Sequence, residues 1–419
     1  MPRNILFLSH RLPYPPNKGD KIRSHALLKH LVSQGRVHLG CFVDDRTDLA
    51  HLDAVRQLAR GDCHFEFIGP ATKAVRSAGA LVTGNSITVA SFASARLQRY
   101  LRRLFSGNSI DDVVVFGSAM APYLFKTEFK PHRVLFDMVD VDSDKWRQYA
   151  VASAGLFKWL YRREAVTLEA TERSAAQLFG KTLLVSEFEA ETFRKIAPES
   201  ASRIGSLTNG VDLSYFATGT FNNPFSETEC PIVMTGHMGY WPNYEGALWF
   251  AKEVLPLVRE SLPNARAYFV GTSPSRALRA AAGRDIVVTG WVADVRPYLQ
   301  FAGAVVAPLR IARGVQNKVL EAMAMAKPVV ATREATRALE VRSGTHLWVA
   351  NDPRQFADAV LSALKGNERE RIARAGRDYV VQNHSWEAVL AGLDTELEAV
   401  RRAQNRPVPQ KKSSLRPAI

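Results

Sequence analysis

Apolar positions along the chain gather in short runs, and longer amphipathic segments separate the runs. The first half has such runs at 4–8, 37–43, 63–68, 112–116, 133–136, 183–186 and 204–208. The second half has them at 232–235, 267–270, 286–288, 304–307, 329–331 and 346–349. A buried parallel strand reads as a continuous apolar run, and the segments between the runs carry apolar residues at helical spacing. The pattern predicts an α/β fold with two doubly wound, Rossmann-like domains facing a cleft.

The change of composition between the two halves sets the predicted domain boundaries. We predict an N-terminal domain over residues 1–216, a polar linker over 217–229 and a C-terminal domain over 230–384. A final helix over 385–402 follows, and then a basic tail over 403–419 whose composition is typical of disorder. The Asn209-Gly210 turn near the first boundary is expected to supply a position with positive φ.

The most informative stretch lies between the apolar runs at 304–307 and 329–331. Its spacing predicts a strand, a loop, a short helix and a strand, with Gly314 where the loop becomes helix. The free amides of a first helical turn favour an anion, and Lys318 adds a positive charge there. Glu321, one turn later, has the chemistry to accept hydrogen bonds from a ribose diol. A solvated Lys–Glu pair on an ordinary helix is the alternative.

The loop after the first strand has a similar character. Three prolines prevent helix as far as Pro16, and a helix is expected to begin near Gly19 or Asp20. A rigid loop, a glycine and a helix N-terminus form a second candidate anion site, to which Lys18 adds charge together with Lys21 and Arg23. An ordinary surface loop is the alternative.

Several acidic residues follow the predicted strand at 133–136. In open α/β sheets ligands bind at the carboxyl ends of the strands, so Asp137 and then Asp140 are the candidates nearest a reacting centre. Asp142 and Asp144 are expected to cap the next helix. The segment lacks the glycine of a calcium-binding loop, and we predict no metal site.

Composition narrows the class of protein. The chain has 419 residues, and its three cysteines are too widely separated for a metal set or a disulfide framework. A formal net charge of +14 attracts nucleic acid, anionic lipid or phosphorylated ligands. Because no nucleic-acid-binding module is recognisable, we expect no nucleic-acid partner and favour an anionic membrane surface.

The segment at 96–105 is a basic amphipathic helix that follows an uncharged segment, 77–95, interpreted as a loop. Arg99, Arg102 and Arg103 lie on its polar face, which suits an anionic membrane. The alternative is a helix packed on the sheet with a solvated basic face. No segment is long and apolar enough to span a bilayer, and the N-terminal run is too short for a signal peptide. We therefore expect a cytoplasmic protein, with peripheral association at the inner face of the cell membrane.

Taken together, the motifs resemble those of a known enzyme family. The two doubly wound halves, Asn209-Gly210-Val211-Asp212, Glu321-Ala322-Met323-Ala324 and Lys327-Pro328-Val329-Val330-Ala331-Thr332 resemble retaining glycosyltransferases of the GT-B fold, family 4. The segments 13–23, Asp140-Val141-Asp142-Ser143 and 314–318 are similar to a subgroup of sugar transferases associated with bacterial exopolysaccharide and PEP-CTERM clusters.

The resemblance implies transfer of a sugar from a nucleotide diphosphate sugar, with retention and without an essential metal or other cofactor. The acceptor would be lipid-linked or a saccharide. Glu321 matches the second glutamate of the family's E-x7-E motif, which contacts the ribose, and Gly19 matches a glycine near the diphosphate. The first glutamate of the motif is replaced by Arg313, and the loop after 232–235 offers His237 and Asn243 in place of the usual Arg and Lys.

These replacements change which residues we expect to bind the donor and the acceptor. We expect Arg313, Gly314, Lys318 and His237 to bind the donor diphosphate, with Lys18 and Asp20 on the acceptor side. The family's histidine after 133–136 is Asp137 here. Two other functions stay open: a sugar-nucleotide epimerase of the same two-domain shape, and a basic, non-catalytic scaffold that binds membranes.

Overall fold

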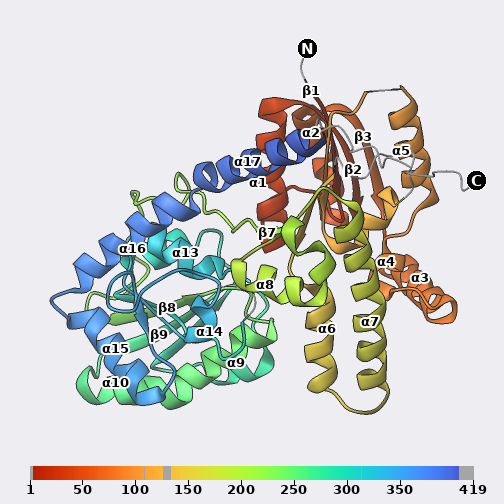
Figure 1. The fold of residues 1–419 in the computed structure, drawn as a ribbon. Helices are drawn as coiled ribbons and strands as arrows, with labels where there is room; N and C mark the ends of the chain where they lie inside the picture. The colour runs from red at the N-terminus through yellow and green to blue at the C-terminus, as the bar shows by residue number, and fades with distance from the viewer. Residues whose placement is uncertain (1–2, 108, 126–133, 313, 405–419) are drawn as a thin grey trace, which may run out of the picture. The chain divides into compact units, whose positions relative to one another are not determined.

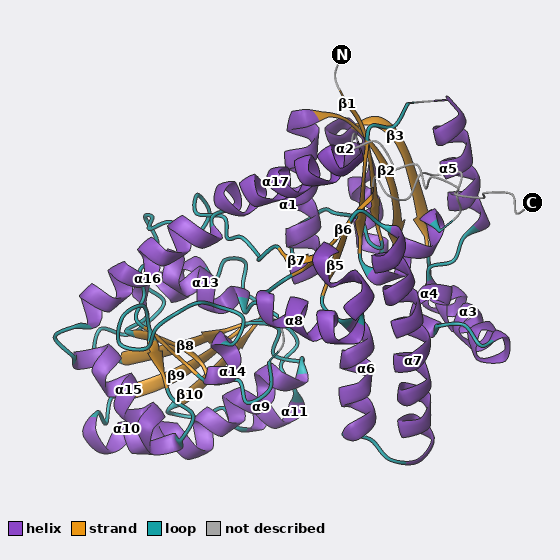
Figure 2. Ribbon diagram, viewed as in Figure 1, coloured by secondary structure: helices purple, strands orange, loops and turns teal. Residues whose placement is uncertain are grey.

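Two parallel sheets organise the protein (Figures 1 and 2). The computed structural model describes residues 3–107, 109–125, 134–312 and 314–404. Within these residues the chain divides into two compact units. Unit 1 comprises residues 1–183, 194–205 and 392–419, and unit 2 comprises 184–193 and 206–391. The division falls earlier than the boundary predicted at 216, and it assigns most of the last helix to unit 1.

The first sheet has the strand order β3-β2-β1-β4-β5-β6-β7. Its strands are β1 (Arg3–Ser9), β2 (Gly35–Val43), β3 (Arg60–Phe67), β4 (Asp112–Phe116), β5 (Val134–Val139), β6 (Lys181–Leu184) and β7 (Ile204–Ser206). The central strand β1 pairs in parallel with β2 and β4, and its residues 5–8 are fully buried. Strands covered by helices on both faces need such continuous apolar runs, which explains why the sequence pattern located them.

Helices cover both faces of this sheet (Figure 2). They are α1 (Gly19–Gln34), α2 (Leu52–Ala59), α3 (Pro70–Thr83), α4 (Ile87–Ser91), α5 (Ala95–Gly107), α6 (Asp142–Val151) and α7 (Gly155–Leu178). The next helix, α8 (Glu187–Ile196), lies mostly in unit 2. The interpretation of 77–95 as a loop was wrong, because α3 and α4 occupy most of it.

The second sheet repeats the order as β10-β9-β8-β11-β12-β13. Its strands are β8 (Cys230–Thr235), β9 (Ala265–Val270), β10 (Ile286–Gly290), β11 (Ala304–Ala307), β12 (Val329–Ala331) and β13 (Trp348–Val349). The helices are α9 (Trp241–Trp249), α10 (Leu255–Ser261), α11 (Arg276–Ala280), α12 (Arg296–Phe301), α13 (Asn317–Ala324), α14 (Arg333–Thr336), α15 (Pro353–Lys365), α16 (Arg369–His384) and α17 (Trp386–Gln404).

The strand order locates a ligand-binding edge in each unit. In a doubly wound sheet, ligands bind at the carboxyl ends of the strands where the direction of winding reverses. The reversal falls between β1 and β4 in unit 1 and between β8 and β11 in unit 2. The fold therefore selects the loops after these four strands as candidate sites.

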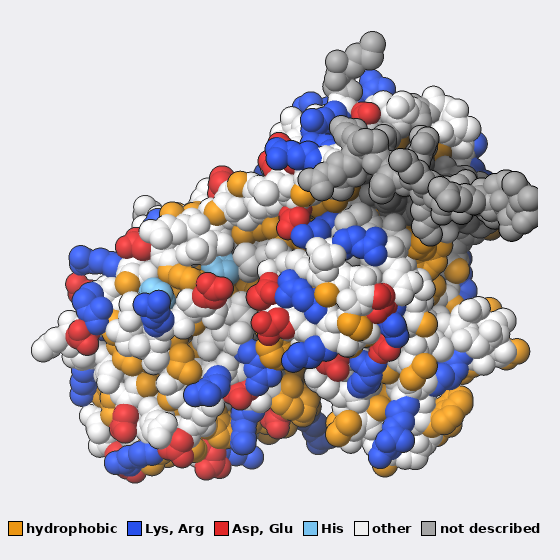
Figure 3. Space-filling model, viewed as in Figure 1, with side chains coloured by type: hydrophobic (Ala, Val, Ile, Leu, Met, Phe, Trp, Pro, Cys, Tyr) orange, Lys and Arg blue, Asp and Glu red, His pale blue; other side chains and the backbone are white. Residues whose placement is uncertain are grey.

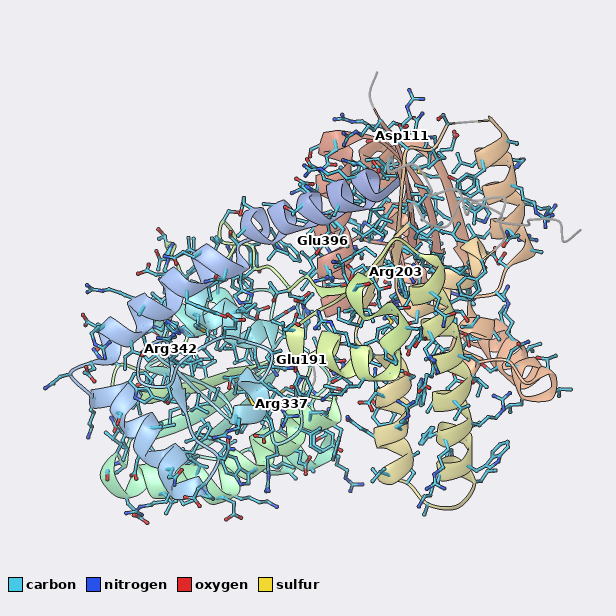
Figure 4. The ribbon with its side chains drawn as sticks, viewed as in Figure 1. Asp111, Glu191, Arg203, Arg337, Arg342 and Glu396 are labelled. Atoms are coloured by element: carbon cyan, nitrogen blue, oxygen red, sulfur yellow. The ribbon has the colours of Figure 1, made fainter. Side chains whose placement is uncertain are left out.

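The last helix, α17, ends against unit 1. Glu396 on α17 lies 2.9 Å from Lys181 Nζ (Figure 4), and Arg401 donates two hydrogen bonds to Asp112, at 2.8 and 2.7 Å. None of the described helices is long and apolar enough to cross a membrane.

Gly210 does not have the predicted positive φ. Glycine is needed at position 210 for a steric reason, because a Cβ there would lie 2.5 Å from Cδ2 of Trp386. The turn is held instead by His384, whose ring lies 3.1 Å from the Asn209 carbonyl oxygen.

An ion pair between Arg23 and Asp137 is buried in the core of unit 1. The guanidinium Nε donates to one carboxylate oxygen at 2.7 Å and Nη2 donates to the other at 3.0 Å. Both side chains are 1% exposed. The charge that Arg23 was expected to add to the anion site is used elsewhere, because it neutralises the Asp137 carboxylate inside the fold.

This pair yields a stability prediction. Arg23→Met leaves the Asp137 carboxylate buried without a cation, so unfolding free energy should fall by about 3–5 kcal/mol. The double variant Arg23→Met/Asp137→Leu removes both charges and should recover most of the loss. Denaturant unfolding followed by circular dichroism measures both. Equal stability of the single and double variants would contradict the assignment.

Candidate functional site

The loop after β8 packs closely against the loop after β9. Gly236 has φ +148 and Gly271 has φ +146, and a Cβ on Gly271 would lie 1.7 Å from the Gly236 carbonyl oxygen. Met238 N donates to Thr272 O at 2.8 Å, and this hydrogen bond joins the two loops. Only glycine permits backbones this close, so both loops are held rigidly at the ligand-binding edge of unit 2.

Lys318 lies in the first turn of α13 and is almost buried beside this loop. Its ammonium donates to Asn243 Oδ1 at 2.5 Å, and Asn243 Nδ2 donates to the His237 carbonyl oxygen at 3.0 Å. A Cβ on Gly236 would lie 3.3 Å from Lys318 Nζ. The absence of a side chain at Gly236 thus leaves room for the buried cation at the end of β8.

Burial changes the proton affinity of Lys318 and of Glu321. Burial lowers the pKa of Lys318 to about 8, although the charge of Glu321 acts to raise it. Burial raises the pKa of Glu321 to about 7, and Lys318 opposes that shift. Two titratable groups with perturbed pKa values at a ligand-binding edge are typical of a functional site.

The other residues predicted for the donor site lie along the same loops. Gly314 has a φ of +57° and lies three residues before α13, which begins at Asn317 rather than at the glycine. His237 directly follows Gly236, and its side chain is exposed. Arg313 lies outside the described residues.

A further cluster near Glu321 was not identified from the sequence. The Arg296 guanidinium lies 4.1 Å from the Tyr215 ring centroid and pairs with Asp294 at 2.7 Å. Tyr215 Oη donates to Asp294 Oδ1 at 3.4 Å. Burial and the charge of Asp294 raise the pKa of Tyr215, and Glu321 contributes to the same rise. Tyr215 was missed because its segment carries no motif and no distinctive spacing.

Unit 1 has its own polar cluster at the carboxyl ends of β1 and β2. His10 stacks on Phe116 of β4, with ring centroids 5.6 Å apart, and its Nε2 lies 3.5 Å from Asp20. Arg11 donates to Asp20 at 2.6 Å and to Asp44 at 2.9 Å. Burial acts to raise the pKa of Asp20, but the hydrogen bond from His10 and the charge of Arg11 outweigh it and hold this pKa well below its ordinary value.

His10 and Arg11 were missed because a lone His-Arg pair has no distinctive spacing. Only their position directly after the central strand could have indicated a functional role. Gly117 makes room for the imidazole, since a Cβ there would lie 2.6 Å from His10 Nδ1.

The predicted residues of the 18–20 segment lie around the start of α1, which begins at Gly19 as expected. Asp20 belongs to the cluster with His10 and Arg11. Lys18 lies 3.9 Å from Asp45, and both side chains are about half exposed. Lys21 is buried in an ion pair with Asp48 at 2.8 Å, so its charge is not free for the predicted anion site.

Asp137 lies inside β5 rather than after it, which corrects its predicted position. Its carboxylate is bound by Arg23 and has almost no contact with solvent. The strand ends at Val139, whose φ of +70 is strained for a β-branched residue. Asp140 N donates to Met138 O at 3.0 Å across this tight turn. Strained backbone of this kind concentrates at functional sites, and it directs the chain into Asp140.

Glu172 binds the segment that follows Asp140. Its carboxylate accepts from Ser143 N at 3.2 Å and from Ser118 Oγ at 3.4 Å. Burial, with the nearby charge of Asp142, raises the pKa of Glu172 to about 8. Glu172 is therefore mainly protonated at neutral pH. Among the described residues, no group of three or more His, Cys, Asp or Glu is placed to hold a metal ion.

The basic helix predicted as a membrane contact is α5. Leu97, Leu101 and Leu104 are buried in unit 1, so its apolar face is not available to a bilayer. Arg99, Arg102 and Arg103 remain exposed on the opposite face. The packed-helix alternative is therefore correct, and the apolar contribution to membrane binding expected of this helix was wrong.

Comparisons with known proteins agree with this fold. Residues 229–366 match the family model described as Glycosyl transferases group 1. No curated protein matches the chain in sequence. The structure is similar to that of HepE from Anabaena in complex with UDP and glucose, with a TM-score of 0.62 and 13% identity over 95% of this chain and 100% of that one.

Two further solved structures show the same likeness. Sucrose-phosphate synthase from Thermosynechococcus elongatus gives a TM-score of 0.67 and 14% identity over 96% of this chain and 100% of that one. The α,α-trehalose 6-phosphate synthase from Burkholderia multivorans gives a TM-score of 0.63 and 11% identity, with coverage of 96% and 100%. The protein thus has two doubly wound domains of the GT-B type, and its second unit carries the segment that matches the group 1 glycosyl transferase model.

The geometry of unit 2 predicts a specific loss of affinity. Lys318→Ala should weaken binding of a nucleoside diphosphate by about 1.5–3 kcal/mol, because the anion loses a charged hydrogen-bond partner. Lys365→Ala, the same change at an exposed position of unit 2, is the matched control and should leave affinity unchanged. Titration calorimetry with UDP and GDP measures both. Equal affinities for the two variants would remove Lys318 from the site.

Proposed function

We propose that the protein transfers a sugar from a nucleoside diphosphate sugar to a hydroxyl of a lipid-linked or saccharide acceptor. The observation that carries the proposal is the buried Lys318. It lies at the start of α13 beside a glycine loop, inside the segment that matches the group 1 glycosyl transferase model. HepE, to which the chain is similar in structure, is described in complexes with UDP and with UDP-glucose.

On this proposal, unit 2 binds the donor. A sugar leaves a diphosphate more readily when positive charge neutralises the developing phosphate charge. Lys318 and the first amides of α13 would supply that charge, Gly314 would allow close approach of the diphosphate, and His237 would contact it from the β8 loop. Glu321 would accept hydrogen bonds from the ribose hydroxyls.

The base would bind near the carboxyl end of β10. Trp291 follows Gly290 there, and its side chain is 72% exposed. An exposed indole at a ligand-binding edge offers a flat apolar face on which a base can stack. This placement is a proposal about base binding and leaves the identity of the base open.

Unit 1 would bind the acceptor. Asp140, after the strained Val139, and His10, held by Phe116 and Asp20, have polar atoms at the carboxyl ends of β5 and β1. Their proposed role is to orient the acceptor hydroxyl. The catalytic role predicted for Asp137 is not carried forward, because Arg23 occupies both of its carboxylate oxygens.

We propose retention of anomeric configuration by a front-face reaction. The acceptor oxygen bonds to the anomeric carbon as the bond to the diphosphate oxygen breaks, and the leaving phosphate takes the acceptor's proton. The chain's own contribution is charge stabilisation and positioning, without a covalent nucleophile and without an essential metal. Synthesis of an exopolysaccharide or glycolipid is the proposed setting.

The experiment incubates the protein with a panel of radiolabelled nucleotide sugars and a polyprenyl-phosphate-linked saccharide. Transfer of label to the lipid, lost in Lys318→Ala, is the expected result. Label converted to a different sugar nucleotide would identify an epimerase. Tight donor binding with neither product would identify a non-catalytic binding protein, and either outcome would overturn the proposal.

A further inference from the structure

The free end of the α6–α7 hairpin exposes large apolar side chains. The two helices pack side by side (Figure 1), and the connection between them runs from 152 to 154. Around it Val151 is 83% exposed, Leu156 75%, Phe157 63% and Trp159 56%. Contiguous exposed apolar groups of this size mark an interaction surface rather than ordinary scatter.

The hairpin holds these side chains on a rigid support. Trp146 and Tyr149 of α6 pack on Tyr161 of α7, with ring centroids 5.4 and 6.1 Å away. Phe157 joins the cluster at 6.2 Å from Tyr161. Aromatic rings thus fasten the two helices together near their free end, while other apolar side chains of the same segment remain in solvent.

Arg163 also links the hairpin to the C-terminal end of α3. Arg163 of α7 donates to the Ala80 carbonyl oxygen at 2.8 Å and to that of Asn85 at 3.1 Å. These bonds tie α3 to the hairpin. Val75 and Val82 of α3 are 74% and 89% exposed. The exposed apolar side chains at the free end of the hairpin, Val151, Leu156, Phe157 and Trp159, are called the apolar tip below.

The charge around the apolar tip has one sign. Residues 145–163 contain no Asp or Glu, and residues 67–110 contain none either. Lys158 and Arg162 lie among the exposed apolar residues of α7. Figure 3 shows hydrophobic and basic side chains together at the free end of the hairpin. Over the whole chain the net charge is +14, but here the acids are absent altogether.

We propose that the apolar tip docks on an anionic phospholipid surface. Trp159, Phe157, Leu156 and Val151 would enter the boundary between headgroups and acyl chains, and Lys158 and Arg162 would contact the lipid phosphates. Tryptophan and tyrosine favour that boundary, and basic side chains add electrostatic attraction to anionic lipid. This combination distinguishes a lipid surface from a protein partner, whose interface core is usually depleted of lysine.

The position of the tip suits the proposed reaction. α6 begins at Asp142, two residues after Asp140, the proposed acceptor-binding residue. Docking through this hairpin would bring a lipid-linked acceptor to the unit that binds it. This connection rests on the proposed function, whereas the docking itself does not.

The test is flotation of the full chain with vesicles of phosphatidylcholine alone or with phosphatidylglycerol added, without nucleotide. We expect binding that requires phosphatidylglycerol and weakens with salt. Leu156→Ser/Phe157→Ser/Trp159→Ser should lower vesicle affinity about tenfold or more, because buried apolar area drives insertion.

A pair of charge variants tests the same surface with little risk to folding. Lys158→Gln/Arg162→Gln should lower affinity several-fold. Arg374→Gln/Arg377→Gln, on exposed positions of α16, removes equal charge and should have little effect. Circular dichroism and thermal unfolding, measured in parallel, check that each variant is folded.

Three results would overturn the proposal: no binding to either vesicle, binding that neither tip variant weakens, or loss of self-association rather than of vesicle binding in the apolar variant. The last would make the tip an interface between copies of the chain. Since no sugar transfer is measured, failure here is distinguishable from failure of the proposed transferase activity.

Discussion

The proposed donor site depends on a lysine that the fold buries beside a glycine loop. Among the described residues, the Lys318 ammonium donates to Asn243 Oδ1, and burial raises the pKa of Glu321, the carboxylate whose charge acts on Lys318. A buried ammonium without a firm ion pair lowers stability, and natural folds accept such a cost mainly at functional sites. A diphosphate would supply the missing negative charge. The glycines at 236 and 271 matter because they let two loops meet around that cation.

In unit 1 the buried cations are paired with carboxylates. Arg23 and Lys21 are both buried, and each is neutralised by an aspartate from elsewhere in the chain, Asp137 and Asp48. What remains at the ligand-binding edge is a linked set of His10, Arg11 and Asp20, with Asp140 after a strained turn. One unit thus offers a buried cation suited to phosphate, and the other offers fixed hydrogen-bonding groups suited to hydroxyls. This contrast accounts for a donor half and an acceptor half in the proposed reaction.

The sequence was sufficient for most of the fold because strands of a parallel sheet are continuous apolar runs. β4, β11 and β12 were located at their exact residues, and α1 begins where the prolines and Gly19 predicted. The sequence did not predict long-range ion pairs. The local pattern around Arg23 carries no sign that this side chain pairs with Asp137, 114 positions away. The amphipathic pattern of α5 fitted a helix on a membrane and a helix on a sheet equally well. The structure distinguishes the two, because the apolar face of α5 is buried in unit 1. The exposed tip of α6 and α7 was not predicted, because apolar residues at helical spacing are typical of the buried face of a helix.

The most direct test of this account is the pH dependence of UDP affinity in the unaltered protein. Bound diphosphate should raise the pKa of Lys318 from about 8, so binding requires the protonated amine. Affinity should therefore change little as pH rises toward 8 and then fall by up to about tenfold per pH unit above it. Lys318→Ala should abolish that fall. Affinity that stays constant through pH 8 to 9.5, or a fall that persists in Lys318→Ala, would contradict the assignment of the buried lysine to the diphosphate.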